Sequence, residues 1–196
     1  MKASSKVITL PALIALFSSV PGIAHAHLTG GSGGFESGLS HPLHGLDHIL
    51  AMVAVGLWAA QLGGRALWIV PASFVGVMVL GGALGHAGVA LPLVEPGITA
   101  SIFILGILLI LAVRVPVGVA AAIVGLFAVF HGFAHGAEAH QNVHFALYAL
   151  GFVLATAVLH GLGVGVGLLA ASVKPFPLIR VAGVAIVAAG VFTLIG

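Results

Sequence analysis

Histidine and carboxylate side chains gather in two short segments of this otherwise apolar chain. The first segment holds three histidines and one aspartate, namely His41, His44, Asp47 and His48. The second holds four histidines and one glutamate, namely His131, His135, Glu138, His140 and His144. Imidazole and carboxylate groups bind divalent transition metals, and placing them in an apolar setting is costly without such a use. The two segments therefore predict that the protein handles a metal ion.

The first segment has the spacing of one helix face. Residues three, four and seven positions apart on a helix lie on the same side, and His41, His44 and His48 follow this spacing. We expect Ser40 to cap a helix that starts here, which puts Asp47 about 9 Å below the helix start at about 1.5 Å per residue. A carboxylate at that depth in a membrane needs a cation, a hydrogen-bond donor or a proton.

The second segment repeats this pattern. His131, His135 and Glu138 share one helix face. Each segment can supply two or three ligands, so together they can complete a coordination sphere between helices. The predicted metal ligands are therefore His41, Asp47, His48, His131, His135 and Glu138, with His44 and His86 as secondary candidates.

The other histidines have simpler interpretations. A single histidine near a membrane interface usually serves as a polar group among the lipid headgroups, and we favour this for His86, His140 and His144 taken singly. His160 lies deep within an apolar run, toward its cytoplasmic half. Two interpretations are open for it: it lines an exit route for the ion, or it bonds to a neighbouring carbonyl.

The composition places these residues in a membrane. Of 196 residues, 61% are hydrophobic and 5% are charged, whereas soluble domains carry roughly 25% charged residues. The chain has no cysteine and three methionines, which excludes iron–sulfur and thiolate sites and argues against a Cu(I) thioether ladder. The predicted ligands are therefore nitrogen and oxygen atoms. The few basic residues offer no surface for nucleic acid.

The first 26 residues are typical of a secretory signal peptide. Lys2 and Lys6 flank the start of an apolar run over 7–20, and the sequence Ala-His-Ala at 24–26 fits the small-x-small cleavage rule. An uncleaved helix is the alternative, but the run is short and Pro11 interrupts it. We predict a signal peptide over 1–26, a flexible periplasmic segment over 27–40 and a membrane domain over 41–196.

The membrane domain is predicted to be an all-α bundle of six transmembrane helices. A span needs roughly 20 apolar residues, and the runs that qualify are 42–62, 67–88, 97–113, 116–136, 143–170 and 177–195. Four basic residues lie at the first, third and fifth connections, namely Arg65, Arg114, Lys174 and Arg180. The positive-inside rule assigns this side to the cytoplasm. We therefore expect an inner-membrane protein with both mature termini in the periplasm.

Glycine is abundant, with 29 residues, and several pairs are spaced four positions apart. This spacing lets helix backbones approach closely in lipid and predicts a compact bundle. The pairs are Gly81/Gly85, Gly132/Gly136, Gly161/Gly165 and Gly163/Gly167.

The two histidine segments resemble the motifs of the HupE/UreJ family of bacterial membrane proteins. The family pattern His-x5-Asp-His matches His41, Asp47 and His48. Its second pattern, Phe-His-Gly-x-x-His-Gly-x-Glu, matches the run from Phe130 to Glu138. The resemblance covers the whole mature chain in the number of spans, the signal peptide and the placement of both motifs.

This resemblance implies a secondary permease for Ni²⁺, with Co²⁺ as an alternative cargo, that supplies hydrogenase or urease maturation. The motif histidines and carboxylates would handle the transported ion, and no cofactor would be permanently bound. The implied partners are the ion and the lipid bilayer, and no enzymatic activity is expected.

Two other functions stay open at this point. The protein could be an accessory or sensor that binds metal without transporting it, or a haem or di-iron membrane enzyme, since paired histidines also ligate haem. The nucleotide-binding motif Gly-x-x-x-x-Gly-Lys-Ser/Thr is missing, so we do not expect ATP to drive transport locally. The choice among Ni²⁺, Co²⁺ and Zn²⁺ is also open, as is the oligomeric state, a homo-oligomer included.

Overall fold

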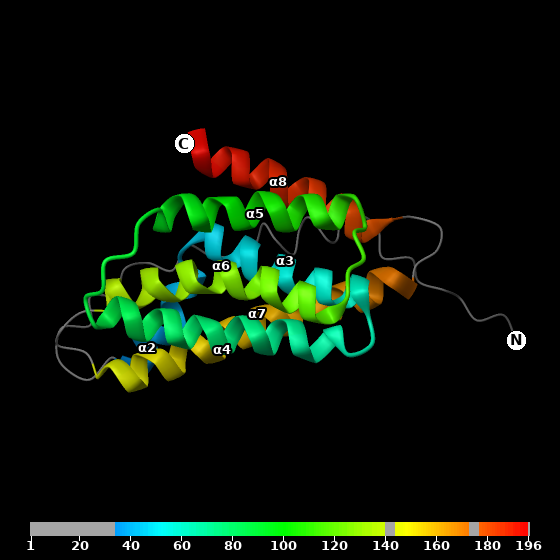
Figure 1. The fold of residues 1–196 in the computed structure, drawn as a ribbon. Helices are drawn as coiled ribbons and strands as arrows, with labels where there is room; N and C mark the ends of the chain where they lie inside the picture. The colour runs from blue at the N-terminus through cyan, green and yellow to red at the C-terminus, as the bar shows by residue number, and fades with distance from the viewer. Residues whose placement is uncertain (1–33, 140–143, 173–176, 196) are drawn as a thin grey trace, which may run out of the picture. The chain divides into compact units, whose positions relative to one another are not determined.

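A computed structural model describes residues 34–139, 144–172 and 177–195, and these residues form helices and no strands (Figure 1). The elements are α2 (Gly34–Ser40), the 3-10 turn η1 (His41–Leu43), α3 (Leu46–Leu62), α4 (Ala66–His86), α5 (Val94–Ile110), α6 (Val117–Glu138), α7 (Phe145–Ser172) and α8 (Leu178–Ile195). The all-helical prediction is confirmed for this part of the chain. The predicted signal peptide, His140 and Lys174 lie outside the described residues.

Most of the helices are long and apolar enough to cross a membrane. By length and composition α4, α6, α7 and α8 qualify, and the bent pair 34–43 and 46–62 makes a fifth span if it is counted as one. α5 is equally apolar but has 17 residues. Among the described residues four to five spans are thus supported, and this shorter helix corresponds to the third predicted span, 97–113.

The segment around the first histidines differs from the single continuous helix that we predicted. The chain bends by 80° between η1 and α3, and Gly45 at the break is extended, with φ −92° and ψ 116°. A Cβ at Gly45 would lie 2.6 Å from Oδ1 of Asp47 and 3.1 Å from Nδ1 of His48. Glycine leaves room for these side chains, and its low helix propensity favours a break at this position.

Residues 34–40 also differ from the flexible segment that we predicted over 27–40, because they form α2. α2 packs against α7 through two glycines. A Cβ on Gly38 would overlap the carbonyl of Tyr148, and a Cβ on Gly151 would overlap the carbonyl of Phe35. The backbones therefore touch, and this packing explains why a short glycine-containing segment is helical here.

Two of the glycine pairs hold α4 against α6, as their spacing predicts. A Cβ on Gly132 would overlap the carbonyl of Met78, and one on Gly136 would overlap the carbonyl of Gly82. From the other side, a Cβ on Gly85 would overlap the carbonyl of Phe133. Gly132 and Gly136 directly follow His131 and His135 along α6. The close packing of these glycines therefore fixes the position of the backbone that carries both imidazoles.

α3 and α7 run in the same direction and are packed in a similar way. Gly56 faces the carbonyl of His160, and Gly163 faces the carbonyl of Val53. By contrast, a Cβ on Gly161 or Gly165 would meet no neighbour within 4 Å, so these two glycines face outward. The α7 glycines therefore divide into a packing set and an exposed set.

α5 and α8 lie side by side at one edge of the described bundle (Figure 1). α3 holds the C-terminal end of α5 by two hydrogen bonds: Nε1 of Trp58 donates to the carbonyl of Val113 (3.2 Å), and Nε2 of Gln61 donates to that of Leu109 (3.2 Å). The first bond reaches Val113, three residues past the end of α5, and the second adds a donor to the Leu109 carbonyl, which also accepts from the amide of Ala112.

Candidate metal centre

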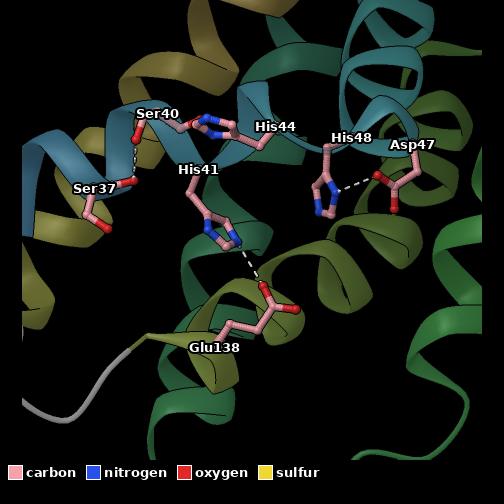
Figure 2. Close-up of polar contacts among 7 residues, drawn as sticks. All are labelled: Ser37, Ser40, His41, His44, Asp47, His48 and Glu138. Atoms are coloured by element: carbon pink, nitrogen blue, oxygen red, sulfur yellow. Dashed lines mark hydrogen bonds and ion pairs between the residues drawn. The ribbon is translucent and has the colours of Figure 1, made fainter. Parts of the chain in front are cut away.

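The first histidine motif contacts the last residue of the second, Glu138 (Figure 2). Nε2 of His41, in η1, lies 2.8 Å from Oε2 of Glu138, the last residue of α6. These two residues are 97 positions apart in the chain. A carboxylate can only accept, so His41 donates this hydrogen bond. The contact joins the start of the first motif to the end of the second.

Three side chains here have the geometry of a metal site. His41, His135 and Glu138 each offer a ligand atom, and these atoms all lie within 4.8 Å of one another. The rings of His41 and His135 meet edge to face with their centroids 4.9 Å apart. A transition-metal ion with nitrogen or oxygen bonds of about 2 Å fits such a group after small side-chain movements.

His48 continues the cluster inward. Its ring centroid is 4.3 Å from that of His135 and 4.8 Å from that of His131. Its Nδ1 lies 3.3 Å from Oδ1 of Asp47, on the side of the ring away from Glu138 (Figure 2). Asp47 is therefore placed as the hydrogen-bonding partner of a candidate ligand histidine, a role that carboxylates often have around bound metals.

Burial increases along this line of side chains. Glu138 and His41 are 55% and 36% exposed, His48 is 12% exposed, and His135 and His131 are 1% and 0% exposed. The cluster thus runs from the surface into the interior of the bundle. An ion bound at the outer members would meet progressively less water at the inner ones.

Several of these imidazoles have ring nitrogens without hydrogen-bond partners among the described residues. The buried atoms are Nε2 of His48, Nδ1 of His131 and Nδ1 of His135. Leaving a buried polar atom unpaired costs about 1–3 kcal/mol. Three such atoms on neighbouring rings are explained most simply if their lone pairs serve to bind an ion.

The charges of the site favour a cation. In the part of the chain that the structure describes, the ion-pairing partners of Asp47 and Glu138 are histidines, with no lysine or arginine among them. When these imidazoles are neutral, as metal binding requires, the two carboxylates leave the cluster negatively charged. An incoming divalent ion would restore neutrality.

One contact of the cluster was missed from the sequence. Ser101, fully buried in α5, places its Oγ 2.9 Å from Nε2 of His131. The available signal was a serine within an apolar helix, whose hydroxyl needs a partner when it is buried. Its partner could not be named without knowing how α5 packs on α6.

The secondary candidates lie outside the cluster. Nδ1 of His44 donates to the carbonyl of Ser40, the last residue of α2 (2.8 Å). This ring is therefore engaged in the turn that precedes Gly45. The ring of His86 stacks on Phe145 with centroids 4.0 Å apart. The structure thus brings the six primary candidates together and leaves His44 and His86 outside the cluster.

Comparisons with known proteins support the family resemblance that the two motifs indicated. A family model described as HupE / UreJ protein matches residues 13–193. The chain is 47% identical to Protein HupE of Rhizobium leguminosarum bv. viciae over 196 residues, which is the full length of both chains. No solved structure matches the chain.

Proposed function

The chain belongs to the HupE / UreJ family, a family of multi-pass membrane proteins, and from this premise we propose that it is a secondary permease for divalent transition-metal ions. The proposed cargo is Ni²⁺, taken from the periplasm to the cytoplasm for the maturation of hydrogenase or urease. Co²⁺ is the alternative cargo.

The observation that carries this proposal is the contact between His41 and Glu138 together with the buried rings behind it. Residues from both motifs form one cluster of nitrogen and oxygen ligands that begins at the surface and continues inward through His135 and His131. A site that only stored an ion would not need this graded path. A permease does, because the ion must lose water in steps.

The steps of uptake follow from the side chains. Glu138 and Asp47 attract the hydrated cation, and the neutral rings of His41, His48 and His135 replace part of its water. Binding stays weak enough for release because no single position supplies a full set of protein ligands. The membrane potential, negative inside, favours cation entry by about 2.3 kcal/mol per unit charge for each 100 mV.

We further propose the topology that this direction of transport needs. Six spans, a cleaved signal peptide and the periplasmic side for both mature termini put the histidine cluster at the outer mouth. Arg65 and Arg114 flank the connections α3–α4 and α5–α6, at the opposite end of the helices from Glu138. That arrangement agrees with the positive-inside rule.

The decisive experiment measures radioactive Ni²⁺ entry into sealed vesicles that contain only this protein. Entry that saturates with external Ni²⁺ and exceeds that of empty vesicles supports the permease. Tight binding to the purified protein without entry into vesicles would instead identify an accessory or sensor protein. Competition by unlabelled Co²⁺ and Zn²⁺ in the same assay defines the selectivity.

A haem enzyme is disfavoured by the geometry of the rings. His48 touches both His135 and His131, with centroids 4.3 Å and 4.8 Å away. Rings in direct contact leave no space for a porphyrin between them. A visible absorption spectrum of the purified protein checks this point.

A further inference from the structure

His160 is a buried histidine that does not belong to the proposed outer site. It lies in the middle of α7 and is 1% exposed. Neither of its ring nitrogens has a hydrogen-bond partner among the described residues. Of the two interpretations that the sequence left open, a bond to a neighbouring carbonyl is therefore not the one observed. An imidazole buried in this way within a membrane helix needs another function.

The surroundings of His160 contain two more atoms that can bind a metal. Thr156 lies one turn earlier on α7, and its hydroxyl is 3.7 Å from the sulfur of Met78 on α4. Phe74 lies one turn before Met78 on α4, and its ring meets that of His160 edge to face, with centroids 5.1 Å apart. These two contacts between the same helices bring an imidazole, a hydroxyl and a thioether into one buried region. Thr156 and Met78 are 1% and 0% exposed.

This region lies directly inward of the histidine cluster. The ring of Phe74 contacts His131 as well as His160. His131 is the outer of the two histidines, and its ring centroid is 5.7 Å from that of Phe74. Along α3, Gly56 faces the backbone of His160 and follows His48 by eight residues. Eight helical residues correspond to about 12 Å of depth. One aromatic ring thus separates the innermost histidine of the cluster from His160.

We propose that His160, with Met78 and Thr156 beside it, forms a second and inner station for the same divalent transition-metal ion. The proposal rests on the proposed function as a permease, because it extends the ion's path from the outer cluster toward the cytoplasm. Imidazole nitrogen suits Ni²⁺ and related transition-metal ions, and a site of imidazole and thioether does not suit Mg²⁺ or Ca²⁺, which prefer oxygen ligands. Conduction through a membrane works best with several weak sites in series, since each one can release the ion to the next.

The transport test uses His160→Leu, which keeps an apolar side chain of similar size and removes both ring nitrogens. We expect the maximal Ni²⁺ uptake rate in vesicles to fall by about tenfold or more, because the inner station then loses its imidazole and keeps only the weaker ligands Met78 and Thr156. The external Ni²⁺ concentration for half-maximal uptake should change less than about twofold, because the outer cluster is intact. Met78→Leu should lower the maximal rate in the same way but by less. His86→Leu, which alters a histidine outside both sites, serves as the matched control.

A binding measurement tests the inner station without relying on transport. Equilibrium dialysis of Ni²⁺ with the detergent-purified protein should show a second, weaker class of sites that His160→Leu lacks, while the tighter class is retained. If wild-type vesicles take up no Ni²⁺ but the His160→Leu protein still lacks the weaker class of Ni²⁺ sites, the permease proposal fails and the inner site stands. If wild-type vesicles do take up Ni²⁺ and His160→Leu keeps the wild-type rate and both classes, only the inner site is overturned. Loss of both classes in His160→Leu would show a purely structural role for this histidine and would also overturn it.

Discussion

The hydroxyl oxygen of Ser101 lies 2.6 Å from the carbonyl oxygen of Ile98 and 2.9 Å from Nε2 of His131. A hydroxyl has one hydrogen, and a carbonyl oxygen can only accept, so Ser101 donates to Ile98 and accepts from His131. Nε2 of His131 therefore carries the ring hydrogen, and Nδ1 holds the free lone pair. That atom is buried and has no partner among the described residues. Ser101 thus orients His131 in the way that outer partners orient metal-binding histidines.

The first prediction follows from this relationship. Ser101→Ala should lower the rate of Ni²⁺ uptake by about tenfold to a hundredfold, the usual effect of removing an outer partner of a metal ligand. Ser172→Ala is the matched control, because the Ser172 hydroxyl makes the same bond to a carbonyl three residues earlier (2.7 Å) and is exposed. Uptake is measured as an initial rate per amount of membrane protein. Equal rates for the two variants would show that Ser101 has no part in the site.

The second prediction concerns the two carboxylates. Glu138→Gln and Asp47→Asn preserve size and remove charge, so each should nearly abolish uptake at low external Ni²⁺. The Glu138 variant removes one ligand from the group His41, His135 and Glu138. The Asp47 variant removes the anion that accepts a hydrogen bond from His48. Glu36→Gln is the control, since Glu36 is an exposed carboxylate on α2. Near-normal uptake by both site variants, with protein present in the membrane, would rule out the proposed site.

The third prediction concerns the histidine ligands. His41→Ala, His48→Ala, His131→Ala and His135→Ala should each reduce uptake strongly, because each removes a nitrogen from the path that leads inward from Glu138. His140→Ala should lose little. A uniform modest loss across all five variants would indicate a general effect of histidine content and no specific site.

The fourth prediction concerns pH. Only a neutral imidazole can bind a metal, and unperturbed histidine titrates near pH 6.5, so protons compete with Ni²⁺ as the outer medium is acidified. Under a fixed membrane potential we expect slower uptake at about pH 5.5 than at about pH 7.5. The measurement is the initial uptake rate in vesicles clamped with a potassium gradient. Faster uptake at the lower pH would point to proton-coupled entry in place of simple facilitated passage.

The fifth prediction tests the packing that positions the site. Gly136→Ala puts a Cβ against the carbonyl of Gly82 and should destabilise the protein by about 1–3 kcal/mol, as overpacking usually does. Gly161→Ala, on an outward face, should change stability by less than about 0.5 kcal/mol. Thermal unfolding in detergent compares the two. A lower melting temperature for Gly161→Ala than for Gly136→Ala would contradict the described α4–α6 interface.

Much of this protein follows from local features of its sequence. The apolar runs predicted α4, α6 and α8 to within two residues at each end, because length and hydropathy are properties of a single segment. The spacing of His131, His135 and Glu138 likewise predicted a shared face, since these residues lie on one unbroken helix. Residue types alone indicated a divalent metal with nitrogen and oxygen ligands. Each of these inferences needs only the geometry of one helix.

The tertiary structure decided what lies between helices. The break at Gly45 turns His41 toward Glu138, and spacing rules that assume a continuous helix could not predict it. The partner of His131, Ser101, comes from a helix that approaches through packing, and no local pattern specifies that approach. His160 shows the same limit: its position in an apolar run was evident, but its lack of a hydrogen-bond partner among the described residues depends on how α7 packs against its neighbours. Contacts between residues far apart in the chain depend on how glycine-lined helices fit together, and only the folded bundle determines that fit.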